Sequence, residues 1–213
     1  VEDKYKPVVK KMFSGFKPHL IGSLKSLNYP TDVSELLDCD GEIPFIVLED
    51  FGTRGLVGDV NQKKADPPGT PRHKRNNFYD FNRRIGRSGK TAKEHGSKGV
   101  GKHVFQAGSK VKMMFSLTHR SDDHKEYLFG RSNLNYHSNG QKYFGPFGQF
   151  SGNPREKGKQ QKPIEDPAYI NKVREAFQLQ RKEGQSGLSI IMPFPVDGLV
   201  KKDLVLFFNE EGK

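Results

Sequence analysis

The residues best suited to chemistry lie in three short segments that each contain glycine. The first segment, EDFGTRG, spans residues 49–55 and follows an apolar, β-branched run at 43–48. A carboxylate at the end of a buried strand can accept a hydrogen bond from an exocyclic amine such as the N6 group of adenine, and glycine lets the backbone approach a flat ring. Asp50, Gly52 and Gly55 are therefore candidate base-binding residues. The alternative is an ordinary strand-to-loop turn, in which Asp and Gly serve only the geometry.

The second segment, GSKGVGKHVF at residues 96–105, places three glycines before a predicted helix start. Backbone N–H groups at such a turn can bind phosphate, and the positive end of the helix dipole favours the anion. Lys102 would add a point charge, whereas His103 occupies the position at which a P-loop has the Ser or Thr that ligates magnesium. The segment is thus a candidate phosphate loop that departs from the P-loop pattern. A solvated basic loop is the alternative.

The third segment, GLS at residues 187–189, opens the apolar strand predicted at 187–193. Taken in order, the three segments resemble the nucleotide-binding boxes of the GHKL ATPases, which include gyrase B, heat-shock chaperone ATPases, histidine kinases and MutL and share the Bergerat ATP-binding fold. The chain most resembles the histidine-kinase-like ATPase domains of large bacterial proteins, some of them linked to defence systems and similar to MORC ATPases. The likeness runs from about Pro7 to Pro195.

The resemblance implies ATP and magnesium as ligands, in a parent protein that hydrolyses ATP to drive a conformational change. It also implies that this parent works with DNA or another protein and dimerises when ATP binds. Asp50 would hydrogen-bond the adenine amine, Ser189 would support Asp50 directly or through water, and Lys102 would face the β- or γ-phosphate. The base pocket would be lined by Gly52 and Gly55, and the phosphates would be wrapped by Gly96, Gly99, Val100 and Gly101. The Asp-x-Gly-x-x-Gly spacing is one residue longer than the usual family spacing.

One part of the family pattern is missing from the sequence. Family members place a helix before the first of these strands, with an Asn that holds magnesium and a Glu that activates water. Here residues 7–13 are predicted to form a strand, and no Glu-x-x-x-Asn pattern precedes Pro7. Glu49 should point away from the Asp50 side chain, because neighbours on a strand face opposite sides. No general base or magnesium ligand is assigned, and we expect a fragment of a longer protein that binds ATP but hydrolyses it poorly.

Positive charge is concentrated in one part of the chain. The net charge is +11, and residues 59–98 contain eleven Lys or Arg against four Asp or Glu, a net +7. Because this stretch is also rich in Pro and Gly, we expect a mobile basic insertion that acts as the ATP lid, with the aromatic run 78–81 anchoring its middle. The alternative function is a nucleic-acid-binding module without catalysis, in which Phe78, Tyr79 and Phe81 stack on bases.

The remaining patterns indicate a single domain of 213 residues. Helices and strands are mixed without strict alternation, which predicts an α+β two-layer domain with a mixed, mostly antiparallel sheet and helices on one face. Strands are expected at 43–48, 110–117, 126–134 and 187–193, with a turn at 120–124 between the second and the third. Helices are expected at 18–27, 31–37, 101–107, 166–177 and 199–208, the fourth capped by Asp166 with Pro167 at its first position. A single cysteine, Cys39, excludes an internal disulfide framework and a cysteine-rich zinc site. No apolar run approaches the ~20 residues of a membrane span, and no secretory signal is visible, so a cytoplasmic setting is predicted.

Overall fold

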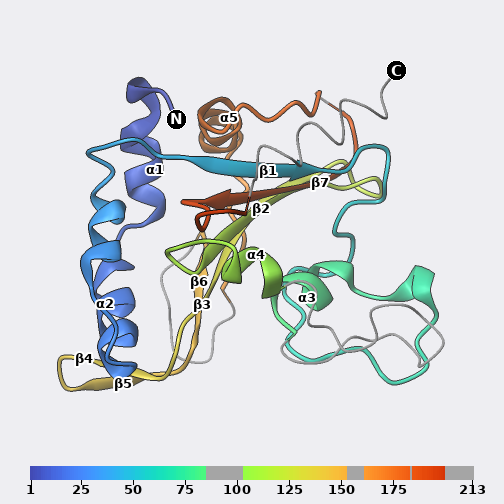
Figure 1. Ribbon diagram of the computed structural model, residues 1–213. Helices are drawn as coiled ribbons and strands as arrows, with labels where there is room; N and C mark the ends of the chain where they lie inside the picture. The colour runs from blue at the N-terminus through green and yellow to red at the C-terminus, as the bar shows by residue number, and fades with distance from the viewer. Residues whose placement is uncertain (85–102, 153–160, 183, 200–213) are drawn as a thin grey trace.

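A five-stranded antiparallel sheet forms the centre of the protein (Figure 1). The computed structural model describes residues 1–84, 103–152, 161–182 and 184–199. The strands lie in the order β1 (Phe45–Glu49), β7 (Gly187–Pro193), β2 (Met113–His119), β3 (Glu126–Asn133) and β6 (Phe147–Phe150). Every pairing between them is antiparallel. The predicted combination of helices with a mostly antiparallel sheet is therefore confirmed, and the four strands expected around the site are all present.

Helices lie on both faces of this sheet. Helices α1 (Lys6–Met12) and α5 (Pro167–Ala176) cover one face, whereas α3 (Asn77–Asn82) and α4 (His103–Ala107) lie on the other (Figure 1). The expectation of helices on one face only is wrong. The reason is visible in β2, where all seven residues are buried: such a strand needs a covering layer on each side, because alternate side chains point to opposite faces.

The face covered by α1 and α5 holds the larger hydrophobic core. Ile170, Val173 and Phe177 follow helical spacing along α5 and are fully buried against strand residues such as Phe115 and Leu128. Asp166 caps α5 as predicted: its carboxylate accepts the Ala168 N–H at 3.0 Å, and Pro167 occupies the first helical position.

The predicted strand at residues 7–13 is wrong, because this segment forms α1. The adjacent Val8 and Val9 have high strand propensity, but Pro7 is well tolerated in the first turn of a helix. Val9 and Met12 then lie three residues apart on one helix face and are both buried. Tertiary burial at helical spacing therefore outweighs local propensity.

A second helical unit lies beside the main sheet. Helix α2 (Lys17–Ser26) packs against the hairpin of β4 (His137–Asn139) and β5 (Lys142–Phe144) (Figure 1). The approach is close, because a Cβ atom added at Gly22 would lie 2.6 Å from the Ser138 carbonyl oxygen. Three short 3-10 helices complete the described elements, namely η1 (Asp3–Tyr5), η2 (Asp32–Asp38) and η3 (Arg72–Lys74). None of the described helices is long and apolar enough to cross a membrane.

Within the described part of the basic insertion, residues 59–84, helix α3 packs against the sheet, whereas most residues from 61 to 75 are exposed. Phe78 is fully buried against Tyr127 and Phe129, which confirms the predicted anchoring by the aromatic run. Asn76 is also buried, and its side chain and backbone bind Asp59, Gln62 and Asp66 at 2.7–2.8 Å. The expected mobility of the insertion and its role as an ATP lid stay predictions, and residues 85–98 lie outside the described ranges. The predicted last helix at 199–208 also lies outside the described ranges, except for its first residue.

Candidate functional site

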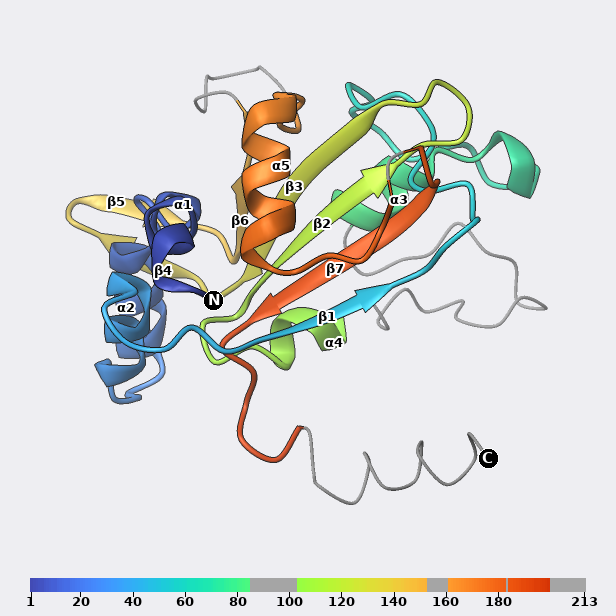
Figure 2. The ribbon, with the colours of Figure 1, turned by 90° about the horizontal axis from the view of Figure 1, so that it is seen from above.

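Asp50 lies directly after β1. Strand β1 forms one edge of the sheet (Figure 2). The Asp50 side chain is exposed, and its Oδ1 atom accepts two hydrogen bonds, from the Leu188 N–H and from the Thr53 hydroxyl, both at 2.7 Å. The Asp50 N–H in turn donates to the Leu188 carbonyl at 2.9 Å. The carboxylate is thus held at the junction of β1 and β7 by partners that engage one of its two oxygens.

The two predicted base-pocket glycines differ in their surroundings. Both have positive φ angles, +70° at Gly52 and +66° at Gly55, a conformation that glycine adopts without strain. A Cβ atom at Gly52 would meet nothing within 4 Å, so space beside it is open. A Cβ atom at Gly55 would lie 2.5 Å from the His119 carbonyl oxygen and 2.7 Å from Thr118 Oγ1. Gly55 therefore permits close packing of this turn onto β2.

Ser189 makes no direct side-chain hydrogen bond to Asp50 in the structure, and support through water, the other form of the predicted contact, stays a prediction. Ser189 is fully buried, and its hydroxyl donates to Glu49 Oε1 at 2.6 Å. The cause is the register of the sheet: Ser189 lies directly opposite Glu49 on β1, so the two side chains share a face. The backbone N–H of the preceding residue, Leu188, binds Asp50 instead. As predicted from strand alternation, Glu49 and Asp50 have separate partners.

Arg181 is the residue of this site that sequence reasoning missed. Its side chain is buried, and its Nη2 donates to the Asp50 carbonyl at 2.7 Å. Its Nε and Nη2 atoms also donate to Ser189 Oγ at 3.3 and 3.2 Å. Burial lowers the pKa of Arg181, and the nearby carboxylates of Glu49 and Asp50 oppose that shift. The sequence gives no signal for this role, because Arg181 follows α5 in a polar stretch without a periodic pattern.

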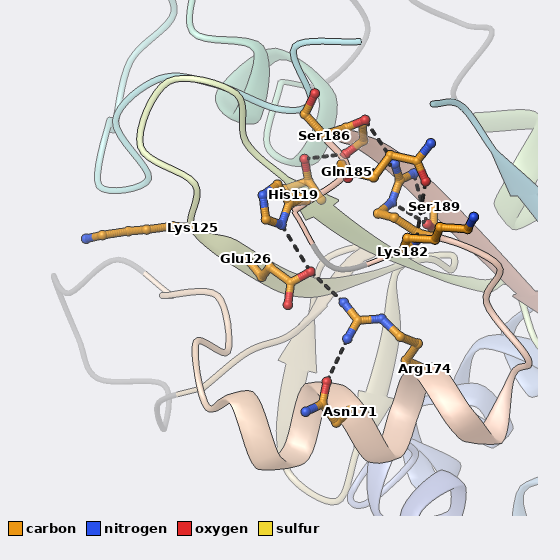
Figure 3. A network of polar contacts seen from close by, with 12 residues as sticks. His119, Lys125, Glu126, Asn171, Arg174, Lys182, Gln185, Ser186 and Ser189 are labelled. Atoms are coloured by element: carbon orange, nitrogen blue, oxygen red, sulfur yellow. Dashed lines mark hydrogen bonds and ion pairs between the residues drawn. The ribbon is translucent and has the colours of Figure 1, made fainter. Parts of the chain in front are cut away.

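A second polar network lies on the same face of the sheet, between the strand ends and α5 (Figure 3). Glu126 Oε1 is 2.5 Å from Arg174 Nη2 and 3.4 Å from His119 Nδ1, and Arg174 also donates to Asn171 at 2.6 Å. These contacts tie α5 to β2 and β3. The predicted hairpin turn at 120–124 lies beside them, and the described part of the chain contains no group of three side chains that could hold a metal ion.

A groove of about 380 Å³ borders the outer edge of β1. Alternate residues of the strand and its extension, Phe45, Val47, Glu49 and Phe51, line one wall. Phe177, Gln178 and Gln180, which follow α5, line the other wall. The groove therefore adjoins the Asp50 turn on the side of Glu49. Asp50 itself is not part of its lining.

The predicted phosphate-loop residues Gly96, Gly99, Val100, Gly101 and Lys102 lie outside the described residues. The helix expected after them is present as α4, which begins at His103. The described part of the candidate site is thus the Asp50 turn with its supports.

Comparison of the chain with protein-family models, curated proteins and solved structures found no match.

Proposed function

We propose that this protein binds ATP, with the exposed carboxylate of Asp50 accepting the adenine amine in a GHKL-type, Bergerat-fold pocket. The observation that carries the proposal is the way this carboxylate is held. The Leu188 N–H and the Thr53 hydroxyl both bind Oδ1, so Oδ2 is the oxygen to receive the N6 amine. A carboxylate that is fixed before the ligand arrives loses little conformational entropy on binding.

Two features near Asp50 support the same proposal. The space beside Gly52 is open, as a flat base stacked on this turn would require. The glycine-rich segment 96–101 leads into α4, and we propose that its backbone N–H groups and Lys102 bind the phosphates. Magnesium would then bind with the nucleotide. The described residues contain no ready-made group of three metal-ligating side chains, so no protein ligand is assigned to it.

We propose that ATP hydrolysis, in the protein to which this domain contributes, drives a conformational change. This is the role to which the ordered boxes around Asp50, Gly99 and Gly187 point. The general base and the magnesium ligand are not assigned, because neither α1 nor α2 contains an Asn, Asp or Glu.

Calorimetric titration of the protein with ATP and GTP tests the proposal. Guanine carries a carbonyl where adenine carries the amine, so the Asp50 carboxylate should reject GTP by at least about tenfold. Asp50→Asn should weaken ATP binding by about 1–3 kcal/mol, the range for a hydrogen bond to a charged group. The matched control is Asp32→Asn, which removes an exposed carboxylate on η2. Equal ATP affinity in the wild type and a folded Asp50→Asn variant would exclude Asp50 from the site.

A second candidate function, nucleic-acid binding, is favoured by one observation. Lys63, Lys64, Arg72 and Lys74 are all exposed on the described part of the basic insertion. Phe78 does not contribute a stacking surface, because it is fully buried. Binding would then depend mainly on phosphate contacts, and its affinity for single-stranded DNA should fall at least about tenfold between 50 and 200 mM salt. Fluorescence anisotropy with a Lys63→Glu/Lys64→Glu variant checks this, and salt-independent binding would contradict it.

A further inference from the structure

We infer that Arg181 is the positioning residue for the Asp50 carboxylate and thereby sets selectivity for adenine. This inference rests on the proposed ATP site. Arg181 itself is buried, with 3% of its surface exposed, so it acts through Asp50.

Arg181 binds acceptors from two parts of the chain, the turn after β1 and residues 185–189 around the start of β7. Nη2 donates to the Asp50 carbonyl after β1, and Nη1 donates to the Ser186 carbonyl at 3.1 Å and, more weakly, to the Gln185 carbonyl at 3.4 Å. Nε and Nη2 reach the Ser189 hydroxyl inside β7. Figure 3 shows Gln185, Ser186 and Ser189 gathered at this point. Only the planar, five-donor guanidinium can bridge so many acceptors in a fixed geometry.

These contacts bracket the amide that orients Asp50. Leu188, whose N–H binds Asp50 Oδ1, lies between Ser186 and Ser189, which Arg181 holds. Gly187 lies in the same gap, where a Cβ atom would be 2.4 Å from the Asp50 carbonyl oxygen and 2.5 Å from Arg181 Nη1. Because Gly187 is packed this closely against both Asp50 and Arg181, we expect a shift of the guanidinium to move the Leu188 N–H relative to the Asp50 carboxylate.

Charge and geometry can be separated at this residue. Glu49 and Asp50 both favour the charged form of Arg181, and burial disfavours it. Lysine would retain a positive charge but lose the fork. If Arg181 contributes only charge, Arg181→Lys should preserve the Asp50 turn. If the planar set of guanidinium donors fixes the Asp50 turn, Arg181→Lys should make this turn more mobile.

The experiment compares Arg181→Lys with Arg174→Lys, a substitution of an arginine in the neighbouring network that binds Glu126 and Asn171. Amide hydrogen exchange is measured at Leu188 and, as an internal reference, at Phe115 in the buried core of β2. We expect Arg181→Lys to raise the exchange rate at Leu188 about tenfold relative to Phe115, as local opening does. In Arg181→Lys, ATP affinity should fall about tenfold while GTP affinity stays constant. Arg174→Lys should change neither the exchange rate of Leu188 relative to Phe115 nor the affinity for ATP relative to GTP.

Two results would overturn the role proposed for Arg181. Unchanged protection of Leu188 in folded Arg181→Lys overturns the inference, as does an equal loss of ATP selectivity in Arg174→Lys. If the wild type binds no ATP, the proposed function fails, and the exchange measurement still decides whether Arg181 positions Asp50. If Arg181→Lys does not fold, Ser189→Ala removes one acceptor while the guanidinium stays. That variant should raise Leu188 exchange about threefold relative to Phe115, and no change would overturn the inference.

Discussion

The Asp50 carboxylate accepts the Leu188 backbone N–H at 2.7 Å, one residue before the serine that the sequence suggested as its support. This bond links the end of β1 to the start of β7, the two strands that pair at the edge of the sheet. A backbone donor is independent of side-chain identity at Leu188, and it fixes the carboxylate relative to the sheet itself. The candidate base-binding group is therefore part of the sheet framework.

We expect Gly187→Ala to destabilise the protein and to disturb Asp50. The added Cβ atom would lie 2.6 Å from Asp50 Oδ1, and φ at this residue is +143°. Overpacking of this kind costs about 1–3 kcal/mol. Denaturant unfolding measures the change, with Gly41→Ala as the control, because a Cβ atom there meets nothing within 4 Å. Equal unfolding midpoints for the two variants would contradict the packing described around Asp50.

The contact between α2 and the β4–β5 hairpin should weaken in acid. His19 Nδ1 lies 2.9 Å from His137 Nε2, and burial, with a smaller effect of His137, lowers the pKa of His19. The unfolded chain therefore binds this proton more readily than the folded one. The stabilisation is complete above the unfolded value of about 6.5 and is lost as pH falls through the lower folded value.

Urea unfolding of the wild type and His19→Gln at pH 7.5 and pH 5 measures this effect. The difference in unfolding free energy between the two proteins should be smaller at pH 5 than at pH 7.5. A constant difference for His19→Gln would show that its protonation is not linked to folding.

Phe78→Ala should cost about 3–5 kcal/mol of unfolding free energy, the range for removing a buried phenylalanine. The ring is fully buried and makes edge contacts with Phe129 and Tyr127 at centroid distances of 5.8 and 6.1 Å. Tyr79→Ala, at a half-buried neighbour, should cost much less. Chemical denaturation of both variants is the measurement. Comparable small losses would mean that residues 59–84 are not anchored through Phe78.

Sequence periodicity predicted the parts of the fold that depend on local pattern. The cap of α5 at Asp166 and the strands around Phe115 and Ile191 followed from residue types and spacing alone. The strand expected at 7–13 was wrong, because the partner of that segment is the distant α5. The second covering layer was missed for the same reason: Phe78 packs against Tyr127 and Phe129, which are distant from it in the sequence.

The candidate site shows the same division. The position of Asp50 at a strand end followed from the sequence, as did its separation from Glu49. The pairing of Ser189 with Glu49 depends on strand register, which the sequence did not define. Arg181 lies 131 positions from Asp50, whose carbonyl it binds, and the two residues meet only in the folded state, so no local pattern could identify this contact.

The chain should bind ATP with magnesium but release phosphate slowly. Loss of a positioned general base typically lowers the rate about 10²–10⁴-fold, and neither α1 nor α2 supplies a carboxylate or an Asn. Lys102 would not replace it, because a protonated amine cannot deprotonate water. Calorimetry and phosphate release are measured on the same sample. Rapid turnover that disappears on substitution of a carboxylate within residues 1–213 would show that the chain has its own base.

Recognition of the adenine amine by the Asp50 carboxylate can be measured in a calorimetric cycle. Wild type and Asp50→Asn are each titrated with ATP and with purine riboside triphosphate, which lacks the amine. We expect the wild type to prefer ATP by at least about tenfold, the worth of a hydrogen bond to a charged group. The variant should bind both nucleotides with nearly equal affinity, since the two changes remove the same interaction. A folded Asp50→Asn protein that keeps the full wild-type preference for ATP would contradict this recognition.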